Sequence, residues 1–188
     1  MTIRPVVRLR GYAYRVFYHL PPRWRRRLVR MGTAKFTVGA VVLVRDPEDR
    51  LVLLRQPPGH GWGLPAGLLK RGESASVGAA RELFEETGLR VSPDDLEPLQ
   101  PNAIVHTKGR WVDLVFTARV PTGSALTVDG GEVYEAAWYR LDALPTLTGP
   151  TAFLLGRYGI GPRAADVAAA AQPTGATGAG AAGTDPAR

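Results

Sequence analysis

Three glutamates and one arginine crowd onto one side of the helix predicted over residues 74–87. At about 100° per residue, Glu82, Glu85 and Glu86 fall within about 100° of one another, with Arg81 at the edge of the same wedge. One guanidinium cannot neutralise three carboxylates, and like charges three and four residues apart repel each other. A magnesium ion, which takes carboxylate oxygens, offsets such a cluster. The wedge therefore predicts a divalent-cation site, and the alternative is an ordinary solvated acidic helix face.

The residues around this wedge favour the cation site. The segment from Gly67 to Leu89 matches the pattern G-x5-E-x7-R-E-U-x-E-E-x-G-U at every defined position, where U is an aliphatic residue. This pattern is the Nudix box, so the chain resembles the Nudix hydrolase family. The resemblance continues into residues 62–67 and 129–145, although Ala66 stands where the family more often has glycine. Together it covers roughly residues 35–158.

The resemblance implies an α/β fold: an α/β/α sandwich around a mixed sheet, with a loop–helix–loop catalytic motif. The three glutamates of the wedge would bind Mg²⁺ or Mn²⁺. Arg81 would hold Glu85 in its metal-binding rotamer. Glu73 and the backbone of Gly67 would complete the loop. The implied reaction is the metal-dependent hydrolysis of a diphosphate linkage in a small-molecule nucleoside diphosphate derivative.

Neither the general base nor the substrate is fixed by the resemblance. The family places the base variably, so Glu85 or Glu86 inside the box, or Glu132 or Glu135 after it, can serve. Val105 stands where ADP-ribose pyrophosphatases of the family tend to carry proline. Elimination of this kind favours a nucleoside triphosphate, including a damaged one. The alternative function is a non-catalytic Nudix-fold module that binds a ligand or regulates, although such modules typically lose box glutamates.

Charge divides the chain into two unlike regions. Residues 1–35 hold nine Arg, one Lys and no acidic residue, which gives 9 + 1 = +10, and the other residues hold 14 basic and 17 acidic groups, which gives 14 − 17 = −3. We predict a basic, helical arm over residues 1–34, a Nudix domain over 35–160, and a disordered Ala/Gly/Pro-rich tail over 161–188. Two alternatives are open for the arm: weak contact with an anionic membrane or nucleic acid, or docking on the domain. The chain has no cysteine, which fits a cytoplasmic protein.

Apolar patterning predicts five strands and two helices within the domain. The predicted strands are residues 36–44, 51–54, 96–106, 110–120 and 133–140, and the predicted helices are residues 74–87 and 148–158. A turn at residues 46–49 should join the first two strands into a hairpin. Residues 56–67, rich in Gly and Pro, are expected to be loop.

Overall fold

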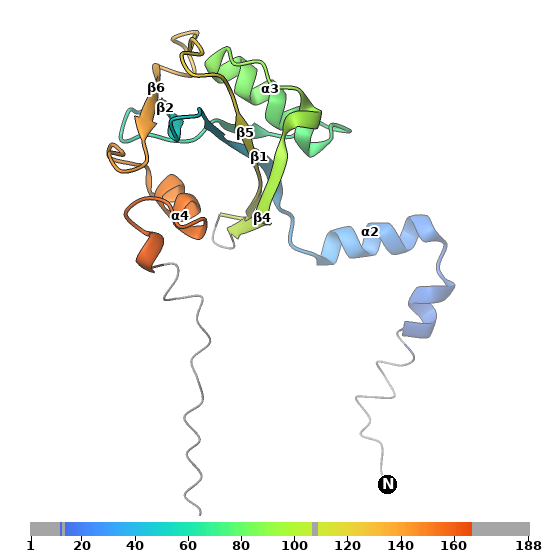
Figure 1. Cartoon of the computed structure of the whole chain (residues 1–188). Helices are drawn as coiled ribbons and strands as arrows, with labels where there is room; N and C mark the ends of the chain where they lie inside the picture. Colours follow the sequence, from blue (N-terminus) through green and yellow to red (C-terminus); the bar gives the residue numbers. More distant parts are fainter. Residues whose placement is uncertain (1–11, 13, 107–108, 167–188) are drawn as a thin grey trace, which may run out of the picture.

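A mixed β-sheet with helices on both faces forms the body of the computed structural model, which describes residues 12, 14–106 and 109–166 (Figure 1). In chain order the elements are α2 (Pro22–Gly32), β1 (Thr37–Arg45), β2 (Arg50–Arg55), β3 (Ala66–Leu68), α3 (Ala75–Thr87), a 3-10 turn (Pro93–Asp95), β4 (Glu97–His106), β5 (Trp111–Arg119), β6 (Glu135–Arg140) and α4 (Gly149–Arg157). The predicted mixed α/β fold is confirmed.

The central strand of the sheet is β1, and the long strands follow the order β4-β5-β1-β2-β6. Strands β1 and β5 run parallel, from Thr37 opposite Trp111 to Arg45 opposite Arg119, and the other pairs are antiparallel. Strands β1 and β2 are buried along most of their length, because helices and loops cover the sheet on both sides. Their pairing confirms the predicted hairpin.

Alternate residues of β1 face two separate cores. Ala40, Val42 and Val44 pack on the face covered by α3, and Val41 and Leu43 pack on the face covered by α4. Each helix contributes its own apolar residues, among them Ala79, Ala80 and Leu83 from α3, and Leu154 and Leu155 from α4. The sheet thus separates the helix that carries the box from the helix near the end of the described chain.

Strand β3 corrects the loop prediction for residues 56–67. Ala66 and Gly67 pair with the edge of β1, where Gly67 lies opposite Ala40 and Ala66 opposite Val41. The expectation of loop at these two residues was wrong because long-range pairing with β1, not local preference, makes this short strand. Its position brings the first residue of the box directly onto the sheet.

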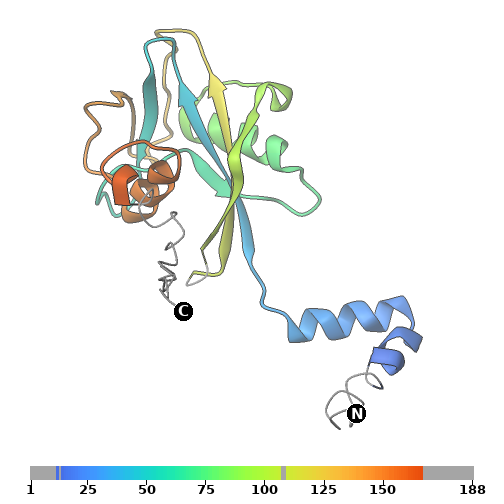
Figure 2. The same cartoon turned by 60° about the horizontal axis from the view of Figure 1, so that its bottom comes forward.

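The arm extends away from the sheet in both views (Figures 1 and 2). Residues 14–19 are helical, the chain bends at Leu20, and α2 begins at Pro22. No residue of α2 is buried, which contradicts the docked alternative. In the described part of the chain, the helices are all too short or too polar to cross a bilayer. The tail predicted as disordered over residues 161–188 is described only at its start, where residues 161–163 form a turn and 164–166 are helical, so the prediction was wrong there; residues 167–188 lie outside the described residues.

Candidate active site

Helix α3 carries the box and buries only part of its acidic wedge. The helix ends where Gly88 takes a left-handed conformation, φ 73°, and donates its N–H to the carbonyl oxygen of Phe84. The predicted helix and its glycine end are therefore confirmed. Glu86 is only 7% exposed, whereas the side chain of Glu82 is 17% exposed and that of Glu85 is 50% exposed. Solvent exposure therefore rises from Glu86 to Glu82 to Glu85.

Arg81 is the centre of an ion-pair network across the box. Its Nε and Nη2 donate to the two carboxylate oxygens of Glu73 at 2.9 and 3.0 Å, a bidentate pair. Its Nη1 lies 2.7 Å from Glu82 Oε1 and 2.8 Å from Glu85 Oε2. Nη2 also donates to the carbonyl oxygen of Leu68 at 3.2 Å. One guanidinium thus links the loop, strand β3 and two glutamates of the wedge.

This network sets the charge of Glu73 and Arg81. The hydrogen bond from Arg81 is the main reason that the pKa of Glu73 falls to about 2, and the backbone N–H of Lys70, which donates at 2.8 Å, adds to it. The hydrogen bond with Glu73 likewise raises the pKa of Arg81. Both groups are charged throughout the physiological range, so the loop is fastened to the helix by a permanent ion pair.

Gly67 allows strand β3 to lie against Glu82. A Cβ atom at this position would come 1.9 Å from the carboxyl carbon of Glu82, closer than any real contact. A Cβ atom at Gly78 would come 2.4 Å from Leu69 Cδ2. A side chain at Gly67 would displace the end of the Glu82 side chain, and one at Gly78 would displace the end of Leu69. Both glycines therefore allow the box loop and helix α3 to lie close together.

Glu86 is held by groups outside the box. Gln56 Nε2 donates to Glu86 Oε1 at 2.7 Å, and the backbone N–H of Ala66 donates to Oε2 at 2.8 Å. Burial, together with the negative charges of Glu82 and Glu132, raises the pKa of Glu86 to about 8, although the hydrogen bonds from the Ala66 N–H and from Gln56 oppose the shift. Gln56 was not among the residues predicted from the sequence, where its only local signal is its place directly after the end of β2.

Glu135 sits apart from this cluster. It begins β6 directly opposite Arg55, and Arg55 Nη2 lies 2.8 Å from Glu135 Oε2. The Arg55 guanidinium also lies 6.0 Å from the centre of the Trp62 ring. Of the two acidic residues considered after the box, Glu132 influences the pKa of Glu86, and Glu135 is engaged with Arg55.

The donor chemistry of the site fits a hard divalent cation. Across the described residues, no three acidic or histidine side chains are arranged around a metal position, because Glu82 and Glu85 turn toward Arg81 and Glu86 turns toward its two donors. The four carboxylates of the box, however, meet only two nearby cations, Arg81 and Lys70. This anionic excess is what carboxylate-bound Mg²⁺ or Mn²⁺ offsets.

A cavity of about 260 Å³ lies beside the two residues that hold Glu86, although Glu86 itself is not part of its wall. Its walls come from the segment between Gln56 and Ala66, and Thr148 and Thr151 close the other side. Because Gln56 and Ala66 also hold Glu86, the cavity and the wedge share two wall residues. The site therefore combines an anionic helix surface with an adjoining concave space.

Comparisons with known proteins match the same part of the chain. The NUDIX domain model covers residues 35–154. A MutT-like protein of Streptomyces ambofaciens is 40% identical over 84 residues, 45% of this chain and 51% of that protein. The human 8-oxo-dGDP phosphatase NUDT18 is 35% identical over 115 residues, 59% of this chain and 34% of that protein. The matches thus span about half or less of these two relatives.

A solved structure agrees on the fold. The crystal structure of a Nudix hydrolase from Nitrosomonas europaea superposes with a TM-score of 0.55 and 22% sequence identity, over 67% of this chain and 71% of the other. At this identity the likeness concerns the fold alone. It agrees with the sheet and flanking helices described above.

Proposed function

Because this chain belongs to the Nudix family and is a Nudix hydrolase, we propose that it hydrolyses the diphosphate linkage of a nucleoside triphosphate, damaged ones included. The observation that carries the proposal is the close packing of β3 on the acidic wedge. Gly67 leaves room for the Glu82 carboxylate, and Arg81 fastens the loop to the same helix through Glu73. An acidic helix face that served only solubility would not require this packing.

The protein residues position the charges that the reaction needs. A divalent cation bound by Glu82, Glu85 and Glu86 would offset the charge of the diphosphate and polarise its phosphoryl oxygens. Arg81 keeps Glu85 in place, since Nη1 donates to it at 2.8 Å. Gln56 and the backbone N–H of Ala66 orient the Glu86 carboxylate. Attack at phosphorus then depends mainly on positioning and charge.

The general base is one of the glutamates considered from the sequence. Glu86 already accepts two hydrogen bonds, and Glu135 would have to leave its ion pair with Arg55 before it could take a proton. Glu85 is likewise held in an ion pair, with Arg81 at 2.8 Å, whereas Glu132 lies near enough to influence the pKa of Glu86. We therefore place the base at Glu132. Loss of a general base lowers the rate about 10²- to 10⁴-fold, so Glu132→Gln should be much slower than Glu135→Gln if Glu132 has this role.

The relatives narrow the substrate class. The human relative is named an 8-oxo-dGDP phosphatase, and the Streptomyces relative is named MutT-like. The name of the human relative supports an oxidised purine nucleotide over an undamaged one. The cavity beside Gln56 and Ala66 is the space next to the wedge where such a nucleotide would be held.

The deciding experiment is a hydrolysis screen with Mg²⁺ and with Mn²⁺. The compounds are 8-oxo-dGTP, dGTP, 8-oxo-dGDP and ADP-ribose. The readout is released phosphate or pyrophosphate for the first three compounds, and released AMP for ADP-ribose. We expect turnover of the oxidised nucleotides that excess EDTA abolishes. Full activity in EDTA would contradict the metal role. Tight binding of one compound without turnover of any would instead support the non-catalytic module.

A further inference from the structure

Helix α2 has a face of four arginines that no carboxylate in the described chain neutralises. At about 100° per residue, the arginines at positions 23, 26, 27 and 30 fall within about 100° of one another. They line a common hollow of about 420 Å³. Among the described residues, no ion pair involves an arginine of α2. This arginine face is therefore available to an anionic partner.

The same helix has a separate apolar face that is also uncovered. Trp24, Leu28 and Met31 fall within about 60° of one another on the helical wheel. They are 49%, 46% and 78% exposed. Large apolar side chains that gather on one face of a soluble protein typically mark a surface that binds something. The partner of α2 must therefore satisfy an apolar face and a cationic face together.

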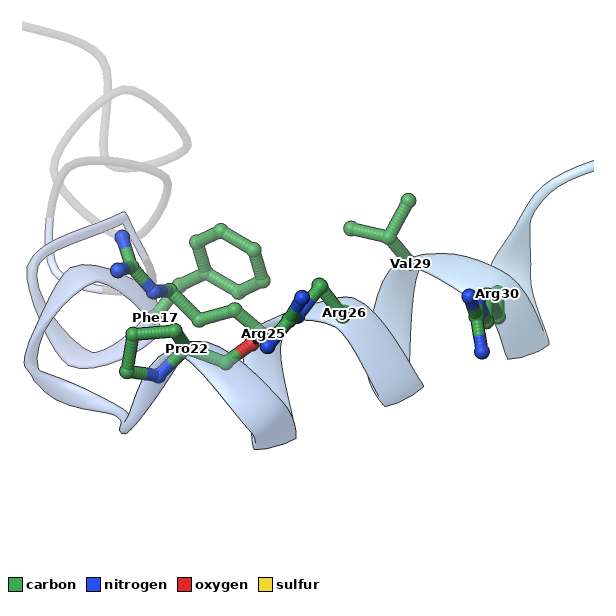
Figure 3. A pocket seen from close by; sticks show the side chains of 6 residues that line it. All are labelled: Phe17, Pro22, Arg25, Arg26, Val29 and Arg30. Carbon is green, nitrogen blue, oxygen red and sulfur yellow. Dashed lines mark hydrogen bonds between the residues drawn. The ribbon is translucent and has the colours of Figure 1, made fainter. Parts of the chain in front are cut away.

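A second, partly apolar hollow lies on another side of α2, where the preceding helical turn meets it. Phe17 and Val29 project from the same side of the helical pair, while Arg30 projects from another side (Figure 3). Together with Pro22, Arg25 and Arg26, these residues line a hollow of about 610 Å³. Exposed tyrosines lie on the preceding helical turn, including Tyr14 and Tyr18. Tyrosine and tryptophan are favoured where an apolar layer meets water.

We propose that residues 14–32 bind the enzyme to the surface of an anionic lipid bilayer, with α2 lying in the plane of the headgroups. The apolar face of α2 enters the boundary of the acyl chains, and the arginine face reaches the lipid phosphates. Charge orients the contact, because residues 1–35 carry +10 and the remainder carries −3. The bilayer attracts the arm and repels the body.

Two other partners satisfy only one of the faces. Nucleic acid would neutralise the arginines but leave Trp24, Leu28 and Met31 in water. A second copy of the chain would cover those apolar side chains, but it would bring two sets of arginines together. An anionic bilayer provides phosphates and an apolar layer within one surface, and for this reason it fits best.

Partition of the full chain onto lipid vesicles tests the proposal without any hydrolysis assay. Sedimentation should show binding to vesicles that contain 30% phosphatidylglycerol in phosphatidylcholine, and much weaker binding to phosphatidylcholine alone. Binding should fall as salt rises, because screening weakens the arginine contribution. Equal partition onto both kinds of vesicle, or onto neither, would overturn the proposal.

Matched charge variants locate the contact. Arg26→Gln/Arg30→Gln and Arg119→Gln/Arg140→Gln remove the same charge, the first pair from α2 and the second from exposed positions of the domain. Each arginine near an anionic surface contributes about fivefold in partition, so the first pair should bind about 25-fold more weakly. The second pair should bind within about threefold of wild type. Equal losses in both would show that only net charge matters, and the proposal would fail.

The apolar face is tested by Leu28→Ala/Met31→Ala, which keeps charge and helix preference. Anionic vesicle binding should fall at least about tenfold, because several buried methylene groups are lost. Circular dichroism should show an unchanged fold. Unchanged vesicle binding in this variant would overturn the proposal. So would duplex DNA binding as tight as that to anionic vesicles and unaffected by the substitution, or a concentration-dependent dimer that the substitution dissolves.

Discussion

Helices α3 and α2 are both strongly charged, but the charged residues of α3 contact neighbouring groups of the domain and those of α2 do not. On α3 the acidic residues have partners, since Glu82 and Glu85 contact Arg81 and Glu86 accepts two hydrogen bonds. On α2 no residue is buried, and the arginines have no carboxylate partner among the described residues. Carboxylates held in place by neighbouring side chains are suited to a reaction that needs charge at a defined position. Arginines without such partners are suited to attraction toward an extended anionic surface.

The largest effect that this comparison predicts is the loss of activity in Glu86→Gln. The substitution removes the charge that a hard cation requires, so kcat/KM should fall on the order of 10²-fold or more, several kcal/mol of barrier. Without metal the melting temperature should change little, because a Glu86 carboxyl with a pKa of about 8 is mostly neutral at pH 7, as the amide is. Turnover at half the wild-type rate in a normally folded variant would show that Glu86 is not a metal ligand.

Gly67→Ala should be the next most damaging change. The added Cβ would meet the Glu82 carboxyl carbon at 1.9 Å, so either β3 or Glu82 must move. We expect a stability loss of about 1 kcal/mol or less, because the Glu82 carboxyl is the end of a flexible side chain and can turn aside. We also expect roughly a tenfold lower kcat/KM, because small displacements at a site lower the rate. The free energy of unfolding from urea titrations and steady-state kinetics measure these effects.

Gly149→Ala is the matched control for this substitution. A Cβ atom at Gly149 meets nothing within 4 Å, and the residue begins α4 on the opposite side of the sheet. The control should keep wild-type stability and activity. If both alanine variants behave alike, close approach at Gly67 does not shape the site.

The Glu73–Arg81 pair predicts how stability responds to acid. The folded-state pKa of Glu73 is about 2, below the ordinary value of 4.5, so the stabilisation is complete above about pH 4.5 and is lost as the pH falls toward 2. Glu73→Gln should therefore lower stability at pH 7 and reduce its dependence on pH in the acid range. Urea unfolding at pH 3 and pH 7 measures both effects. An unchanged acid profile in the variant would contradict the pair's contribution.

Local sequence patterns predict α3 and its site more completely than they predict the surroundings. Helical periodicity and Gly88 are properties of one short segment, so both the helix and its end could be found without the rest of the chain. The hydrogen bond from Gln56 to Glu86 and the pairing of Arg55 with Glu135 depend on how distant strands align. Register is set by the whole sheet, and no local pattern encodes it.

The same reasoning explains the error at β3 and the pairing of His106. Gly- and Pro-rich sequence predicts loop, but Ala66 and Gly67 find hydrogen bonds at the edge of β1. His106 meets Trp111 and Asp113 because β4 and β5 pair with each other. This pairing stacks its ring on Trp111 at 4.4 Å and places Nε2 2.8 Å from Asp113 Oδ2. The structure and contacts of such residues are determined by strand pairing and not by local composition.

The smallest effect on chemistry is expected from removal of residues 1–31. This deletion takes away a basic helix that buries nothing, so the domain should keep a cooperative melt near the wild-type Tm. Metal-dependent hydrolysis should stay within about tenfold of wild type, under roughly 1.4 kcal/mol in the barrier. Binding to anionic vesicles should disappear. The comparison between the two helices would break if the deletion variant folded normally and lost hydrolysis, since the arm would then help to build the site.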